Sequence, residues 1–161
     1  NTPAAMAQHR WEHRAQLRAD NWTLDFIARD AETQELVGVV DLSAENFAAA
    51  REVQTASWVL HRFQGQGYGT LIRQAVAEFS FSHLDAHSLR TCWIKTNRAS
   101  ARVSEKMGYR IYTEKKEEPA GPEKINRPMV SARLSAADYH RPEGVQVDVT
   151  GVGEQLLHML S

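Results

Sequence analysis

Apolar and polar positions along the first sixty residues predict a helix, a hairpin and an interior strand. Apolar residues at the three-to-four spacing of one helix face predict a helix over 3–18. Strict alternation then predicts two strands, over 22–28 and 36–40, joined by a turn-like segment. After a loop or short helix around Asn46, a β-rich run over 52–60 is apolar on both faces near its end, which is typical of an interior strand.

The rest of the chain continues to alternate helices and strands. The elements predicted in chain order are a helix over 71–79, a strand over 89–95, a helix over 99–107 capped by Gly108, a strand beginning at 109–112, a strand over 129–134 that Pro128 opens, a short helix over 136–139 capped by Ser135, a strand over 145–149 and an apolar helix over 154–160. The polar segment Glu114–Lys124 is expected to be a solvated loop. We expect one domain over 1–144 and a C-terminal extension over 145–161 that packs on this domain or on a partner subunit.

Composition narrows the class of protein. The 161 residues include 19 basic and 20 acidic side chains, so the near-neutral charge gives no reason to expect a nucleic-acid partner. No apolar run approaches the roughly 20 residues of a membrane-spanning helix, and the start of the chain lacks the pattern of a signal peptide. The single cysteine, Cys92, excludes an internal disulfide and fits a reducing cytosol, so we expect a cytoplasmic protein without membrane contacts. Its position within a predicted strand indicates a small core residue.

Three alternating glycines separate the strand over 52–60 from the next helix. Gly65, Gly67 and Gly69 allow the backbone to approach an anion, and the first free N–H groups of the helix then point at it. The loop lacks the Lys of a P-loop, and a dinucleotide-binding fingerprint that began at Gly65 would require a glycine where Thr70 stands. The pattern therefore indicates a different kind of phosphate-binding loop, with a tight turn that binds nothing as the alternative.

Two segments resemble the signatures of a known family. Gln64-Gly65-Gln66-Gly67-Tyr68-Gly69 is similar to the coenzyme A loop of the GNAT superfamily of N-acetyltransferases. The segment 97–109, Asn-Arg-Ala-Ser-Ala-Arg-Val-Ser-Glu-Lys-Met-Gly-Tyr, resembles the second signature helix of that family. The two stand in the right order, with room for one helix and one strand between them, and the resemblance covers about 22–134. It is greatest to the RimJ/RimL-type branch, which contains the ribosomal-protein N-terminal acetyltransferases.

The resemblance implies an α/β (α+β) fold: a mixed, twisted, mostly antiparallel sheet flanked by helices. In this family the fourth and fifth strands splay apart, and acetyl coenzyme A enters the gap between them. On this mapping 52–60 is the fourth strand and 89–95 is the fifth. The family opens with a strand and a helix, whereas a single helix precedes Trp22 here. We therefore expect the first strand to be missing from this chain.

The resemblance also implies which residues bind the coenzyme. Backbone groups of Trp58, Val59 and Leu60 would pair with the pantetheine arm and polarise the thioester carbonyl. The pyrophosphate would lie on the backbone of Gln64, Gly65, Gln66, Gly67, Tyr68, Gly69 and Thr70, where substitutions matter mainly if they block φ freedom at Gly67 or Gly69. Asn97 is predicted to cap the following helix, to bind the pantetheine arm, or both. A basic helix face could meet the 3′-phosphate or could simply be solvated; it consists of Arg98, Arg102 and Lys106.

Two side chains are predicted to be catalytic. Ser104, seven residues after Asn97, occupies a family position that often carries Tyr, and would protonate the departing sulfur; the alternative is a solvent-facing serine. Glu52 begins the strand that runs toward the thioester and is the first candidate for the base, with an exposed strand-end charge as the alternative. The glutamate common in the family aligns better with Gln54, and Asp41 is the reserve candidate.

The resulting hypothesis is an N-acetyltransferase that transfers acetyl from acetyl-CoA to a primary amine by direct attack in a ternary complex. The acceptor would be a protein N-terminus or a small-molecule amine, and the C-terminal extension could form a homodimer. One alternative is an acyl-CoA-binding module without turnover. A remote one is a zinc hydrolase, because His9 to His13 spells His-x-x-Glu-His. We expect no metal, since no further element of that signature is visible.

Overall fold

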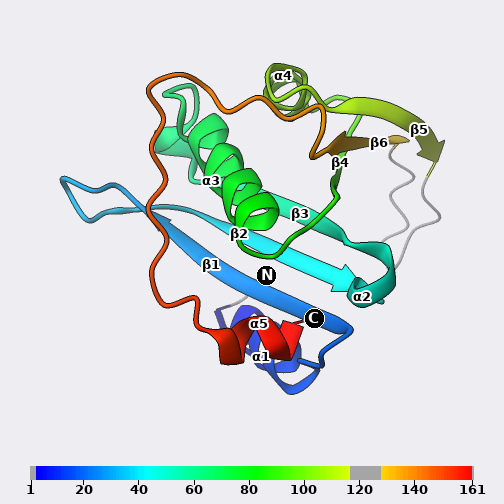
Figure 1. Cartoon of the computed structure of the whole chain (residues 1–161). Coiled ribbons are helices and arrows are strands. Elements are labelled where there is room, and N and C mark those ends of the chain that lie inside the picture. Colours follow the sequence, from blue (N-terminus) through cyan, green and yellow to red (C-terminus); the bar gives the residue numbers. More distant parts are fainter. Residues whose placement is uncertain (1–2, 117–127, 161) are drawn as a thin grey trace.

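In the part of the chain that the structure describes, six strands form one sheet, with helices packed on both of its faces (Figure 1). The structure is a computed structural model that describes residues 3–116 and 128–160. The elements are α1 (Pro3–Ala15), β1 (Asn21–Arg29), β2 (Leu36–Glu45), α2 (Phe47–Ala50), β3 (Glu52–Val59), a 3-10 turn (His61–Phe63), α3 (Tyr68–Ser82), β4 (Ser88–Ile94), α4 (Arg98–Lys106), β5 (Arg110–Lys116), β6 (Pro128–Ser135) and α5 (Glu154–Leu160).

The strand order is β1-β2-β3-β4-β6-β5. β3 and β4 run parallel, and every other neighbouring pair in the described sheet is antiparallel. A parallel pair requires a crossover, which α3 provides between β3 and β4. The mixed, mostly antiparallel sheet flanked by helices confirms the predicted fold class.

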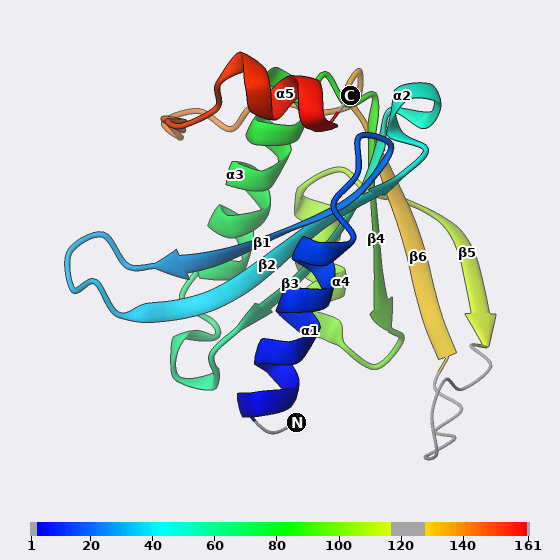
Figure 2. The same ribbon diagram turned by 90° about the horizontal axis from the view of Figure 1, so that it is seen from below.

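The core lies on the face of the sheet that α3 covers. Alternate residues of the inner strands, among them Leu42, Val53 and Leu89, are fully buried there against Val76 and Ala77 of α3. The intervening residues point to the opposite face, where α1 lies. Figures 1 and 2 show α3 and α1 on opposite sides of β1 and β2. The His13 ring ties α1 to that face through Asp25 of β1, with Nδ1 and Oδ1 3.1 Å apart.

The C-terminal helix packs on its own domain. Leu160 is buried in the main core, and the indole Nε1 of Trp22 donates a hydrogen bond to its carbonyl at 2.9 Å. The apolar face of α5 is therefore covered by contacts within the same chain. The prediction of a strand over 145–149 was wrong, because this segment pairs with none of the described strands; Val147 and Val149 instead line a cavity beside α3. The alternation of valines in this segment therefore reflects side-chain packing and not the pairing of a β-strand.

Three other local predictions need correction. The first helix ends at Ala15, three residues before the predicted end. The helix predicted over 136–139 is a turn, in which Ser135 Oγ accepts from the Asp138 amide at 3.1 Å and donates to the Asp138 carboxylate at 2.8 Å. Ser135 thus makes the hydrogen bonds of a helix cap, but they stabilise a local turn and no helix follows. Of the loop predicted at Glu114–Lys124, residues 114–116 belong to β5, and the remainder lies outside the described residues.

Candidate active site

β3 and β4 part halfway along their length. They pair from Glu52 with Ser88 to Thr55 with Thr91, after which β3 stays paired with β2 and β4 with β6. We call the opening beyond the Thr55–Thr91 pair the fork. Ala56, Ser57 and Trp58 are exposed there although β3 is an interior strand, and the exposed fraction of Trp58 is 54%. The divergence predicted for these two strands is confirmed, and it leaves the β3 backbone open on one edge (Figure 2).

The glycine loop follows β3 directly and presents backbone amides. Gly65 and Gly67 have φ values of +76° and +91°, and a Cβ at either position would meet nothing within 4 Å. Thr70 and Leu71 donate their N–H groups to the Gly67 carbonyl, so α3 begins here. Within the described residues, the N–H groups of Gly67, Tyr68 and Gly69 have no assigned acceptor. These amides and the helix dipole favour an anion at this point.

The role predicted for Gly69 needs correction. Gly69 lies inside α3 and has no positive φ, and a Cβ there would stand 3.8 Å from Val59 Cγ2 and 3.9 Å from Val103 Cγ2. Those are ordinary van der Waals distances. The requirement for left-handed backbone therefore falls on Gly65 and Gly67.

Side chains of the loop anchor its backbone, a role that the sequence did not reveal. The Tyr68 hydroxyl donates to Asp30 in the β1–β2 turn at 2.6 Å, and this bond is the main reason that the pKa of Asp30 falls to about 2. The Gln64 side chain donates to the Val59 carbonyl at 3.0 Å, and that of Gln66 to the Arg62 carbonyl at 2.7 Å. The amides are thus held in place before any ligand arrives.

Ser104 is buried against an arginine. Its residue exposure is 2%, and its Oγ accepts a hydrogen bond of 2.6 Å from Nη1 of Arg73 on α3. Nη2 of the same guanidinium donates to Ser100 Oγ at 2.9 Å. The alternative of a solvent-facing serine was therefore wrong. Arg73 was not predicted as a site residue; the available signal was a cation one helical turn before the buried Ala77.

One aromatic residue and one cysteine near the fork, Tyr109 and Cys92, interact with Arg73. Its guanidinium carbon lies 5.8 Å from the centre of the Tyr109 ring. Burial raises the pKa of the Tyr109 phenol, while Arg73 and a hydrogen bond with the Thr55 side chain oppose this rise. Cys92, one residue beyond the last β3–β4 pair, interacts electrostatically with Arg73. Cys92 is exposed, which corrects its expected place in the core, because β3 no longer covers β4 at this point.

Asn97 caps α4 as predicted. Its side-chain oxygen accepts from the Ser100 N–H at 3.1 Å. This leaves the side-chain amide of Asn97 available to a ligand. The basic face of the helix is exposed to solvent along its length, at Arg98, Arg102 and Lys106.

Glu52 lies at the closed end of the β3–β4 pair. Its carboxylate approaches Arg133 Nε at 2.6 Å and Arg90 Nε at 3.7 Å, and it accepts a hydrogen bond from Ser88 at 3.1 Å. It is therefore not an isolated strand-end charge. These ion pairs join three strands where β3 begins, on the opposite side of the Thr55 pairing from the fork.

Asp41 lies beside the fork. It stands opposite Ala56 of β3, the first residue beyond the last β3–β4 pair, and opposite Asp25 of β1. Burial and a hydrogen bond with Asp25 raise the pKa of Asp41, and the charges of Arg10 and His13 oppose the rise. One carboxylate oxygen of Asp41, Oδ1, is buried and has no hydrogen-bond partner among the described residues. This carboxyl pair faces α1, on the side of the sheet away from α3.

The zinc-hydrolase motif is not supported by the described side chains. They contain no group of three or more His, Cys, Asp or Glu residues that could hold a metal. His13 contacts Asp25, and the side chain of His9 lies outside the described residues.

Among the described residues, no helix is long and apolar enough to cross a membrane.

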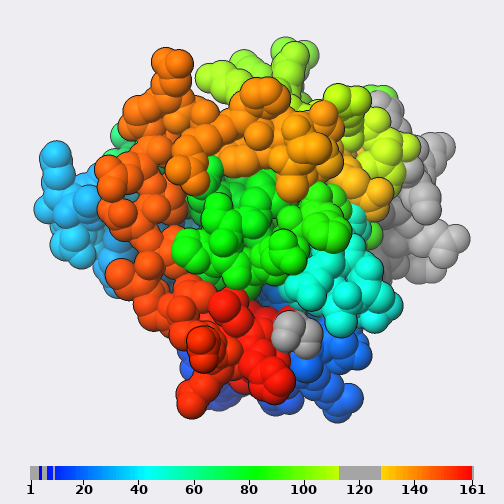
Figure 3. Space-filling model, in the orientation of Figure 1, coloured from blue at the N-terminus to red at the C-terminus, as the bar shows by residue number. Residues whose placement is uncertain are grey.

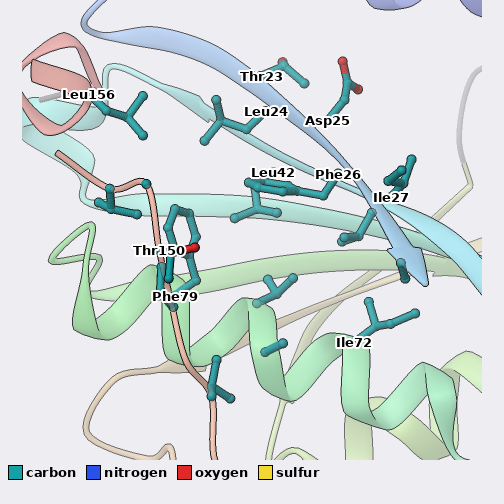
Figure 4. Close-up of a pocket in the computed structure, with 18 of the residues that line it drawn as sticks. Thr23, Leu24, Asp25, Phe26, Ile27, Leu42, Ile72, Phe79, Thr150 and Leu156 are labelled. Carbon is teal, nitrogen blue, oxygen red and sulfur yellow. The ribbon is translucent and has the colours of Figure 1, made fainter. Parts of the chain in front are cut away.

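A cavity that is partly open to solvent lies away from the glycine loop. It has a volume of about 760 Å³ and is lined mainly by β1, α3 and residues 147–152 of the segment before α5. Figure 3 shows the C-terminal part of the chain running around α3, and Figure 4 shows Leu24 and Phe26 pointing from β1 toward α3 while Asp25 points away. None of the loop residues 64–70 lines this cavity.

Comparison with known proteins places this geometry in a family. Residues 1–110 match the family model described as acetyltransferase (GNAT) domain. A spermidine N-acetyltransferase from Vibrio cholerae, solved with CoA and spermine, superposes with a TM-score of 0.72 at 16% identity, over 86% of this chain and 79% of that one. A putative ribosomal-protein-serine acetyltransferase from Vibrio cholerae gives a TM-score of 0.66 at 20% identity, over 81% of this chain and 72% of that one. The chain therefore belongs to the acetyltransferase (GNAT) domain family and is an acetyl-CoA-dependent N-acetyltransferase.

Proposed function

We propose that the enzyme acetylates a cationic primary amine by direct attack on acetyl-CoA in a ternary complex. The observation that carries this proposal is the junction of two features at the end of β3: an open strand edge and a loop of free amides. A strand edge can pair with the amides of a pantetheine arm, and helix-terminal N–H groups can hold a pyrophosphate. One extended ligand can engage both.

The coenzyme is proposed to follow β3 and then the loop. The backbone of Trp58 and Val59 would pair with the pantetheine arm. The same role predicted for Leu60 needs correction, because its N–H donates to the Val37 carbonyl at 2.8 Å and its carbonyl accepts from the Phe63 N–H at 2.9 Å. The pyrophosphate would lie over the amides of Gln64, Gly65, Gln66, Gly67, Tyr68, Gly69 and Thr70. Asn97, at the start of α4, would add its free side-chain amide. The Val59 carbonyl already accepts a hydrogen bond from the Gln64 side chain at 3.0 Å, so a pantetheine amide that pairs with this carbonyl would share or replace that bond.

We assign the acid to Ser104 and move the base from Glu52 to Asp41. Glu52 is engaged by two arginines, and it stands four residues, or about 13 Å of extended strand, before Ala56 at the fork. Asp41 is level with Ala56, and its pKa is raised by burial and by Asp25, so its carboxylate is a stronger base than an ordinary one. Proton transfer from the amine to Asp41, directly or through water, would free the nucleophilic lone pair.

The acceptor is proposed to enter from the face on which α1 lies. Asp25 and Asp41 point to that face, and two carboxyl groups attract an ammonium ion. The structural neighbours include an enzyme crystallised with spermine and one described as acting on a ribosomal protein. Polyamines and peptides with a free N-terminus, the latter typical of the RimJ/RimL-type branch, are therefore the first acceptors to test.

The test is release of free coenzyme A from acetyl-CoA with spermidine, spermine and short peptides with a free N-terminus. We expect release that depends on the amine and is lost in Asp41→Asn, while Glu52→Gln retains it. Calorimetric titration with CoA would run in parallel. Binding without release across the panel would overturn the proposal and leave an acyl-CoA-binding module; absence of binding would remove the coenzyme site itself.

A further inference from the structure

The guanidinium of Arg73 is a buried cation that pairs with no carboxylate among the described side chains. The exposed fraction of Arg73 is 8%, and among the described residues its hydrogen-bond partners are the neutral hydroxyls of Ser104 and Ser100. Burial of a charge without a counter-ion is costly, and proteins usually avoid it. Other arginines of the chain do have carboxylate partners: Arg62 pairs with Glu35 and Arg110 with Asp138. A buried cation without a counter-ion would be compensated by a negative charge that develops beside it only during the reaction.

The surroundings of Arg73 place this charge at the fork. Tyr109, which lies beneath the guanidinium, hydrogen-bonds Thr55 at the last β3–β4 pair, and Cys92 on the other strand interacts with Arg73 electrostatically. The proposed path of the coenzyme brings the thioester to this opening. The negative charge that appears there during acetyl transfer is the thiolate of coenzyme A.

We propose that Arg73 is a positioning residue that acts through Ser104 to stabilise the leaving thiolate. This inference rests on the proposed function. A guanidinium has donors and no acceptor, so the 2.6 Å contact uses a lone pair of Ser104 Oγ and leaves the hydroxyl proton for another acceptor. The positive charge also makes that proton a better donor, because it stabilises negative charge on the oxygen.

The step balances without a further reactant. The amine nitrogen forms a bond to the acetyl carbon, the carbon–sulfur bond breaks, and the bonding pair goes to sulfur. The Ser104 hydroxyl donates its proton to sulfur, giving the free thiol. The ammonium substrate loses two protons, one to the base before attack and one after the carbon–nitrogen bond has formed. One of these protons returns through water to the serine oxygen beside Arg73 and the other is released, so the net products are the amide, free coenzyme A and one proton.

The experiment titrates the thiol of bound coenzyme A, which requires no acceptor. The thiolate is followed by its ultraviolet absorbance in complexes of the wild type, Arg73→Met and Ser104→Ala. In the wild type we expect the bound thiol to titrate about 1 pKa unit below free coenzyme A, as for an acid near an opposite charge. Both variants should lose this shift. Desulfo-CoA, which lacks the sulfur, should bind all three proteins within about threefold.

Controls separate this role from a structural one and from failure of the coenzyme site. Arg110→Met makes the same change at an exposed arginine and should retain the thiol shift. Arg73→Lys keeps the charge and should retain part of the shift, which covers the case in which Arg73→Met does not fold. An unchanged thiol titration in Ser104→Ala or in a folded Arg73 variant would overturn the inference, although coenzyme binding would persist. Loss of desulfo-CoA binding in the wild type would instead contradict the proposed function.

Discussion

Replacement of Gly67 by alanine tests whether the backbone of the loop, and not its side chains, binds the coenzyme. With φ at +91°, an L-residue at this position costs about 1–2 kcal/mol. No atom lies within 4 Å of the added Cβ, so steric overlap contributes nothing further. If the chain relieves the strain by turning the amides away, the same energy appears as a 5- to 30-fold rise in the Kd for CoA, by about 1.4 kcal/mol per tenfold.

Gly69→Ala is the matched control two residues away. Its Cβ would make ordinary contacts with Val59 and Val103 at 3.8 and 3.9 Å, and alanine within a helix is about 0.5–1 kcal/mol more stable than glycine. We expect this variant to melt slightly above the wild type and to bind CoA with a similar Kd. Calorimetric titration and thermal unfolding of both variants give the two quantities. Wild-type affinity in Gly67→Ala, or a larger loss in Gly69→Ala, would refute the reasoning.

Three further predictions concern stability and pH dependence. Leu160→Ala should lower the free energy of unfolding by about 2–4 kcal/mol, because Leu160 is buried in the main core; an unchanged denaturant midpoint would show that α5 does not stabilise the domain. Since the pKa of Asp41 is raised, wild-type activity should fall with decreasing pH above the usual carboxyl range; activity that stays constant down to that range would exclude Asp41 as the base. Tyr68→Phe should return the pKa of Asp30 from about 2 toward 3.8, which an NMR titration measures. Because the folded pKa is depressed, the contribution of this contact is present above about pH 4 and is lost as the pH falls toward 2.

Local sequence patterns predicted most of the fold because the contacts that define each element join residues that are close together in the sequence. The alternation over 22–28 and 36–40 predicted the β1–β2 hairpin, and the glycines before residue 70 predicted the start of α3. The same alternation failed at 145–149, where Val147 and Val149 line a cavity and the segment joins none of the described strands. Periodicity reports which residues face the core but not whether a strand partner exists.

The chemistry of the site was less predictable because it depends on register and packing. The contact between Arg73 and Ser104 joins two helices, and the opposition of Asp25 and Asp41 requires the exact pairing of β1 with β2. Glu52 was predicted to be the base because it begins β3, but the parallel pairing with β4 puts it at the closed end of that pair. No sequence spacing encodes these distances.

The most direct measurement of the central claim is a crystal structure of the enzyme with bound CoA. The account predicts the pyrophosphate on the amides of residues 65–70, the pantetheine arm along β3 beyond Thr55, and the thiol at the fork near Ser104. Coenzyme density in the cavity between β1, α3 and residues 147–152, with the loop and the fork empty, would contradict it.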